Sequence, residues 1–237
     1  MSEDVSPTTD PMQGVQAEPR LLAGAPRGRV LCFAPHPDDE AIGPGGALAL
    51  HARQGDAVRV VIATDGRSGD PDRRHAPEHY AALRRTESTN GLRALGVTDV
   101  TFWGFPDNQS YSATDLELAT RMAAEVIRAH AADVVYLPWE REGHGDHHVL
   151  HLAVVKAMEM VGYRGRAFGY EVWNAMVPDV LLDITTVVEQ KRAAMKCHAS
   201  QLAYVDYEHV ILGLNAYRSL VHGAGKGWAE AFRVLRG

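Results

Sequence analysis

The sequence predicts a single α/β domain built on a mostly parallel β-sheet flanked by helices. Short apolar runs alternate with longer helical segments, a pattern typical of parallel strands joined by helical crossovers. A chain of 237 residues, 46% of them hydrophobic, is long enough to bury one substantial core. Residues 1–27 are polar and acidic and lack periodicity, so we expect a flexible N-terminal tail before one domain over residues 28–237.

Turn residues and apolar runs give the order of the elements. Strands are expected at residues 29–34, 58–63, 97–103, 134–137, 167–172 and 180–184. Helices, several of them followed by a glycine, are expected at residues 43–53, 79–95, 114–131, 147–160, 189–198 and 210–220. Open α/β sheets bind ligands beyond the carboxyl ends of their strands, so the loops after the first four strands are expected to carry the chemistry.

Composition excludes several classes of protein. The net charge is -6 and the basic residues are scattered, so neither nucleic acid nor an anionic membrane is expected as a partner. No apolar run approaches the ~20 residues of a membrane span. Two cysteines are too few for a disulfide framework, and residues 1–20 do not read as a secretory signal. We therefore expect a cytoplasmic protein, with a homo-oligomer compatible with the sequence.

The first predicted strand leads directly into a dense cluster of metal-ligand side chains at residues 35–40. His36 and Asp39 can reach one ion from a turn stiffened by two prolines, and zinc accepts both imidazole nitrogen and carboxylate oxygen. Asp38 would then lie beside the ion without ligating it. The alternative is a polar turn in which Asp38 or Asp39 only caps a helix. Crowded carboxylates repel one another unless a cation compensates them, which favours the metal site.

A second polar cluster follows the fourth predicted strand. It holds four histidines, and a three-ligand catalytic zinc site would need one of them. Spacing alone does not choose among them, because two pairs are separated by four residues on a helix. Asp146 can orient one of these imidazoles through a hydrogen bond. The alternative is a solvated loop rich in histidine. The four candidates are His144, His147, His148 and His151.

Together these motifs resemble the LmbE-like, or PIG-L, family of zinc-dependent N-deacetylases. Residues 34–40 read A-P-H-P-D-D-E where the family reads A-H-P-D-D-E, and residues 144–147 read H-G-D-H where it reads H-P-D-H. The resemblance spans about residues 29–233. Weaker matches are Arg84-x-x-Glu87, Leu95-Gly96, Phe105-Pro106-Asp107 and Ala229-Glu230-Ala231-Phe232.

The resemblance implies a Rossmann-like fold, with one Zn²⁺ per chain. Carried over position by position, it makes His36, Asp39 and His147 the metal ligands and Asp38 the general base. It implies a hydrolase that removes an acetyl group from a small N-acetylglucosamine-type amino-sugar conjugate. One alternative is an amidase that cleaves a larger acyl group from an amino sugar or thiol conjugate. A metal-dependent phosphoesterase is less favoured, because the sequence has no glycine-rich phosphate loop.

The same match implies roles for residues outside the metal set. His144 corresponds to the residue that stabilises the oxyanion and protonates the leaving amine, and Asp146 would hold it in position. Arg84 and Asp107 fall where family members contact the substrate sugar. Where some members have a tyrosine that assists the oxyanion, this chain has Glu142. Two smaller departures are an additional proline before His36 and a glycine between His144 and Asp146.

Overall fold

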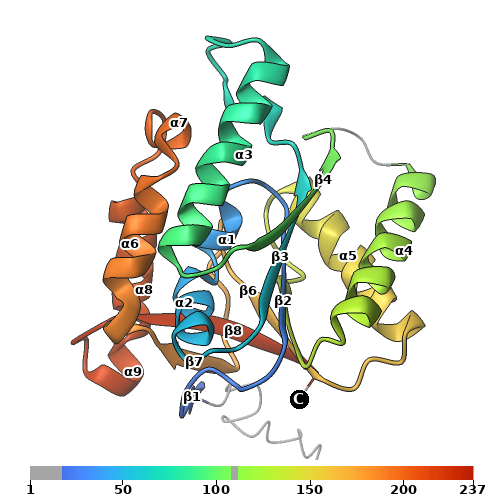
Figure 1. The fold of residues 1–237 in the computed structure, drawn as a ribbon. Helices are drawn as coiled ribbons and strands as arrows, with labels where there is room; N and C mark the ends of the chain where they lie inside the picture. The colour runs from blue at the N-terminus through green and yellow to red at the C-terminus, as the bar shows by residue number, and fades with distance from the viewer. Residues whose placement is uncertain (1–17, 108–111, 237) are drawn as a thin grey trace, which may run out of the picture.

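Eight strands form one sheet in the order β1-β7-β8-β6-β5-β2-β3-β4. The computed structural model describes residues 18–107 and 112–236, and all eight strands lie in these ranges (Figure 1). Neighbouring strands are parallel except that β8 runs antiparallel to β6 and β7. The predicted mostly parallel α/β sheet is therefore confirmed. The strands are β1 (Arg20–Leu22), β2 (Val30–Ala34), β3 (Val58–Thr64), β4 (Asp99–Phe105), β5 (Val134–Pro138), β6 (Arg166–Tyr170), β7 (Val180–Asp183) and β8 (Ala229–Arg236).

Helices cover both faces of this sheet (Figure 1). Two of them, α4 and α5, pack against each other on one face, and α2, α3, α6 and α8 lie on the other. Among the helices of the described residues, none is both long and apolar enough to cross a membrane. The helices are α1 (Asp39–Ile42), α2 (Gly45–Arg53), α3 (Pro77–Ala94), α4 (Ala113–His130), α5 (Gly145–Met160), α6 (Val188–Lys196), α7 (Ala199–Leu202), α8 (Tyr207–Arg218) and α9 (Leu220–Gly223), with short 3₁₀ turns at Arg67–Gly69 and Thr185–Val187.

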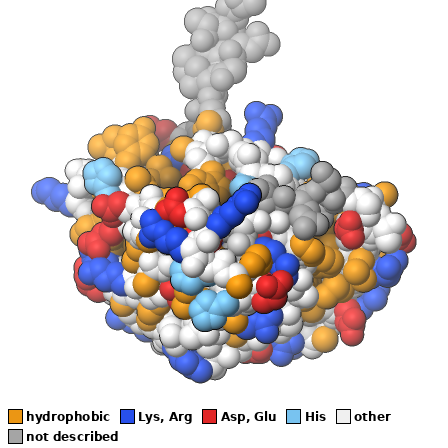
Figure 2. Space-filling view, turned by 90° about the horizontal axis from the view of Figure 1, so that it is seen from above, with side chains coloured by type: hydrophobic (Ala, Val, Ile, Leu, Met, Phe, Trp, Pro, Cys, Tyr) orange, Lys and Arg blue, Asp and Glu red, His pale blue; other side chains and the backbone are white. Residues whose placement is uncertain are grey.

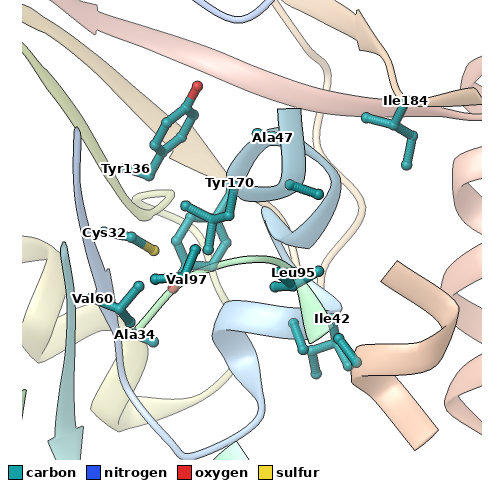
Figure 3. Packing of buried hydrophobic residues seen from close by; sticks show 14 of the residues in the cluster. Cys32, Ala34, Ile42, Ala47, Val60, Leu95, Val97, Tyr136, Tyr170 and Ile184 are labelled. Carbon is teal, nitrogen blue, oxygen red and sulfur yellow. The ribbon is translucent and has the colours of Figure 1, made fainter. Parts of the chain in front are cut away.

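The larger hydrophobic cluster lies between the sheet and the helices on the α2 side (Figure 3). Cys32 and Ala34 of β2 and Val60 of β3 contribute side chains that are completely buried. Ile42 of α1 and Ala47 of α2 meet them from the helix layer (Figure 3). Burying a side chain such as Val60 or Ile42 contributes about 1.5–3 kcal/mol, so this packing helps to hold α1 against the end of β2.

The strand order places the loops after β2 and β5 side by side. From β2 the chain moves to β3 and β4 on one side and then crosses back to β5 on the other. The pairings Val30↔Val134 and Cys32↔Tyr136 set the two strands in parallel register. Such a reversal of strand order opens a crevice at the carboxyl ends of the two strands, which is where α/β proteins bind ligands. Both predicted polar clusters follow these two strands.

Several elements differ from the sequence-based expectations. Arg20–Leu22 lie within the expected flexible tail, yet they form β1 and pair with Val180–Leu182, so that prediction is wrong for these residues. Residues 1–17 lie outside the described part of the chain. The strand β8 was not predicted, because Glu230 and Arg233 interrupt its apolar pattern. Helix α5 begins two residues earlier than predicted and so includes Asp146 in its first turn.

Candidate active site

The turn after β2 is held in shape by the side chain of Asp39. Its Oδ2 accepts a hydrogen bond from the backbone N–H of His36 at 2.9 Å and lies 3.0 Å from the Nδ1 atom of the same residue. The Pro35 carbonyl accepts from both the backbone N–H and the hydroxyl of Thr64, each at 2.9 Å, which ties the turn to β3. The turn therefore holds His36 and Asp39 in a fixed relation.

The three predicted metal ligands converge on one oxygen atom. Asp39 Oδ2 lies 3.0 Å from His36 Nδ1 and 3.2 Å from His147 Nε2, although His147 comes from the other loop. His147 is completely buried, and among the described residues neither of its ring nitrogens has a hydrogen-bond partner. A buried polar atom without a partner is costly, and a metal ion bound at Nε2 would satisfy it. The residues present thus fit a divalent ion.

Two further sets of potential ligands share His36. One ring nitrogen from each of His36, His144 and His147 lies within 4.8 Å of the other two, and one ligand atom from each of His36, Asp107 and Asp146 does the same. The geometry therefore concentrates more donors around His36 than a three-ligand site needs. The tetrahedral preference of zinc requires a choice among them, and the buried Asp39–His147 contact favours the predicted set.

Carboxylates dominate the electrostatics of this cluster. Burial alone would lower the pKa of His36, but hydrogen bonds to Asp107, Asp146 and Asp39 raise that pKa well above its usual value. Burial alone would raise the pKa of Asp39, yet His147 and His36 hold it well below its usual value. The site thus stabilises positive charge at His36 and negative charge at Asp39. Such an arrangement favours binding of a cation.

The predicted general base, Asp38, is buried beside the ligands and held by two side chains. Arg84 Nη2 lies 3.0 Å from Asp38 Oδ2, and the Tyr207 hydroxyl donates to the same oxygen at 2.6 Å. Arg84 also donates to the carbonyls of Gly66 and Pro37. The predicted substrate-contacting Arg84 therefore makes its closest contacts within the protein, where it fixes Asp38.

Asp107, the other predicted substrate contact, also reaches the site. Its Oδ1 lies 3.4 Å from His36 Nε2, and its Oδ2 accepts the backbone N–H of Ser68 at 3.0 Å. The side chain is almost fully buried. Asp107 thus joins the loop after β4 to the loop after β3 at the edge of the candidate metal cluster.

His144 caps α5, and its environment differs from the expected one. Its Nδ1 accepts the backbone N–H of Asp146 at 3.3 Å, so a neutral ring carries its proton on Nε2. Asp146 Oδ2 lies 3.9 Å from His144 Nδ1, whereas it lies 2.9 Å from His36 Nε2. Burial, together with the charges of His36 and His147, lowers the pKa of His144. The carboxylate of Asp146 therefore contacts His36 more closely than the histidine it was expected to orient.

The structure also distinguishes the four histidines of the second cluster. His147 is buried at the centre, while His144 stands half-exposed at the rim. His148 is exposed, and its Nδ1 lies 3.3 Å from the carbonyl oxygen of Glu140. His151 is buried away from the cluster, with Nδ1 2.8 Å from the Pro138 carbonyl oxygen. Sequence spacing could not distinguish these histidines, because the members of each pair, His144 and His148 or His147 and His151, are four positions apart and so lie on the same side of the helix.

A pocket of about 150 Å³ opens over this cluster. It lies on the face at the carboxyl ends of the parallel strands, where histidines and charges of both signs are intermixed with apolar side chains (Figure 2). Six of its lining residues were not predicted from the sequence, and no local motif marks them. Ser68 and Gly69 come from the loop after β3, Trp173 from the loop after β6, and Gln201, Val205 and Tyr207 from the α7–α8 region. The complete lining is His36, Asp38, Asp39, Ser68, Gly69, Arg84, Asp107, His144, Trp173, Gln201, Val205 and Tyr207.

Comparison with known families agrees with this geometry. Residues 31–158, more than half of the chain, match the family PIG-L, described as GlcNAc-PI de-N-acetylase. The matched segment runs from β2 to α5 and so includes both loops that form the cluster. The chain belongs to the PIG-L family, and the resemblance seen in its motifs is confirmed.

Individual relatives within this family are deacetylases. A 1D-myo-inositol 2-acetamido-2-deoxy-alpha-D-glucopyranoside deacetylase from Kineococcus radiotolerans is 33% identical over 69% of this chain, which spans about half (52%) of that relative. A 2'-N-acetylparomamine deacetylase from Streptomyces fradiae is 32% identical, with 74% of each chain covered. The N,N'-diacetylchitobiose deacetylase of Pyrococcus horikoshii superimposes with a TM-score of 0.72 at 26% identity, covering 87% of this chain and 83% of that one.

Proposed function

We propose that this protein is a zinc-dependent N-deacetylase that removes the acetyl group from an N-acetylated amino sugar. The observation that carries the proposal is the convergence of His36 and His147 on Asp39 Oδ2, with Asp38 lining the same pocket. Two imidazoles and a carboxylate beside a separate buried carboxylate form the set that metal-assisted amide hydrolysis requires.

His36, Asp39 and His147 would hold the ion. When bound, zinc supplies a Lewis acid that polarises the amide carbonyl and makes water more acidic. The buried ring of His147, whose Nε2 lies 3.2 Å from Asp39 Oδ2, and the surplus of carboxylates around His36 support this assignment. Asp107 and Asp146 remain close enough to His36 to hold its ring in place.

The remaining side chains would handle the protons and the developing charge. Asp38 would accept the proton of the attacking water, while its contacts to Arg84 and Tyr207 keep its carboxylate in place. His144 would donate a hydrogen bond from Nε2 to the oxyanion, because its Nδ1 already accepts the backbone N–H of Asp146. The neutral ring suffices for this role. The leaving amine would take up the proton that Asp38 removes from the attacking water, because a neutral imidazole cannot give up its single N–H proton.

The relatives suggest the kind of substrate. The Kineococcus enzyme is named for an acetamido sugar linked to inositol, and the Pyrococcus enzyme for a disaccharide. We therefore propose a substrate in which the N-acetylated sugar is joined to a second ring. A phosphoesterase is disfavoured, because the pocket lining contains three aspartates, and its arginine is already paired with Asp38.

A substrate screen tests the proposal. Zinc-loaded protein is incubated with N-acetylated mono- and disaccharides, matching substrates with longer N-acyl groups, and a phosphate ester, and released acid and phosphate are measured. We expect acetate release that stops with a chelator. Asp38→Asn should retain metal and lose roughly 10²-fold or more in kcat, whereas Asp39→Ala should lose metal. Faster release of a longer acid would favour the larger-acyl amidase, and phosphate release alone would reject the deacetylase.

A further inference from the structure

One wall of the pocket carries an aromatic side chain that the proposed chemistry does not use. Trp173 lies in the loop after β6 and lines the pocket together with His36, Asp38 and His144. The residue is 51% exposed, whereas His36 and Asp38 on the floor of the pocket are 8% and 4% exposed. Because the exposed indole lines the pocket, its apolar face is available to a ligand bound there.

The backbone of Trp173 is anchored to the candidate metal centre through Glu142. The Glu142 carboxylate accepts the N–H groups of Val172 at 2.7 Å and Trp173 at 3.0 Å, as well as the indole N–H of Trp139 at 2.9 Å. The same carboxylate lies 3.5 Å from His147 Nδ1. Glu142 thus links the position of Trp173 to a proposed ligand.

A second ion pair braces the other part of this loop. Arg218 of α8 contacts both oxygens of Glu171, at 2.9 and 2.6 Å, and donates to the Met176 carbonyl at 2.8 Å. The Met176 backbone N–H donates to Glu171 at 2.7 Å. All three side chains are buried or nearly so. Because the loop is held on both sides of Trp173, the backbone that carries the exposed indole has a defined position.

We propose that Trp173 is a specificity-determining residue that packs against the second ring of the substrate, the ring joined to the N-acetylated sugar. The inference rests on the proposed function. The acetamido group must approach Asp38 and the ligands on the pocket floor, so the part of the substrate farther from the scissile bond meets the rim. Pyranose and cyclitol rings present apolar C–H faces that an indole buries well. A preorganised loop loses little conformational entropy when such a ring binds.

The test compares one-ring and two-ring substrates. Acetate release from N-acetylglucosamine and from N,N'-diacetylchitobiose is measured for wild-type protein, Trp173→Ala and Trp173→Phe. We expect Trp173→Ala to lose about tenfold in kcat/KM on the two-ring substrate, mainly through KM, with little change on the one-ring substrate. Trp173→Phe should retain most of the preference. Val177→Ala, on the same loop and 60% exposed, is the matched control and should behave as wild type.

An equal loss of activity on both substrates would overturn the proposal, because it would indicate a structural role for the indole. Failure of the proposed function is separable from this result. If wild-type protein releases acetate from neither sugar, the role of Trp173 is tested by calorimetry, which measures the binding of glucosamine and of the fully deacetylated disaccharide. If wild-type protein binds the disaccharide more tightly than glucosamine and Trp173→Ala loses this difference, the proposed contact between Trp173 and the second ring is supported. Equal binding of the two sugars by wild-type protein rejects it.

Discussion

Arg84 and Asp38 form a buried ion pair in which Nη2 lies 3.0 Å from Oδ2. The hydroxyl of Tyr207 donates to the same oxygen, so both contacts engage one side of the carboxylate. We assign the role of base to the other oxygen, Oδ1. Two residues from α3 and α8 thus orient a side chain that the β2 loop supplies.

Removing the cation of this pair should destabilise the fold. Arg84→Met leaves the buried Asp38 carboxylate without its partner, which we expect to cost about 3–5 kcal/mol of unfolding free energy. The neighbouring Arg85 is exposed and contacts the Phe102 ring, so Arg85→Met should change stability by less than about 0.5 kcal/mol. Denaturant unfolding at equal metal loading measures both. Similar stabilities of the two variants would contradict a structural pairing of Arg84 with Asp38.

The hydroxyl of Tyr207 should matter for turnover more than for binding. Tyr207→Phe keeps the ring but removes the O–H that orients Asp38, so we expect kcat to fall by about tenfold with little change in KM. Tyr204→Phe is the control, since its hydroxyl donates to Asp70 instead. Steady-state kinetics on an N-acetylated sugar measures both variants. Wild-type kcat in Tyr207→Phe would show that Asp38 is positioned without this hydrogen bond.

Metal binding should discriminate between adjacent histidines of α5. His147→Ala removes a buried proposed ligand and should abolish tight zinc binding, as should His36→Ala. His148→Ala should bind about one zinc ion per chain like the wild type, because this side chain is exposed and faces the Glu140 carbonyl. Elemental analysis after dialysis gives the occupancies. Full occupancy in His147→Ala would require another ligand set, with His144 as the nearest candidate.

His144 should contribute to catalysis without being a metal ligand. We expect His144→Ala to retain zinc and to lose roughly 10²–10³-fold in kcat, the effect of removing one oxyanion donor. KM should change little, since the contact strengthens in the transition state. Zinc content, kcat and KM are measured in parallel for wild-type protein and His144→Ala. Loss of metal in this variant would instead support the grouping of His144 with His36 and His147 as ligands.

A buried histidine near Asp38 should make stability depend on pH. Burial, which outweighs the attraction of Asp38, lowers the pKa of His198 to about 4 from an ordinary value of 6.5. Between these values the unfolded chain binds more protons than the folded protein. The contribution of His198 to stability is therefore fully present above pH 6.5 and is lost as the pH falls through about 4.

Replacing His198 should reduce this dependence. His198→Leu should flatten the slope of unfolding free energy against pH between 6.5 and 4, as measured by denaturant titrations at several pH values. His209→Leu, at an exposed position on α8, should keep the wild-type slope. An unchanged slope in His198→Leu would assign the pH dependence to other groups.

Local residues determined much of the candidate site. The alternating apolar runs predicted the α/β sheet, because strand and helix periodicities depend on neighbours in sequence. The two prolines and three carboxylates after the first strand predicted a ligand-bearing turn, and Asp39 indeed holds His36 across only three positions. Family motifs then singled out His147 among four histidines, and the structure places it in contact with Asp39.

Tertiary structure alone decided which distant residues surround that turn. Tyr207 reaches Asp38 across 169 positions, and Trp173 joins the same pocket through the loop after β6. Strand β8 lies between β6 and β7 in the sheet, and no apolar pattern in the sequence predicted it. These contacts depend on strand order and on how helices pack over the whole core. Such long-range packing is set by the sum of many burial energies, and no short stretch of sequence encodes it.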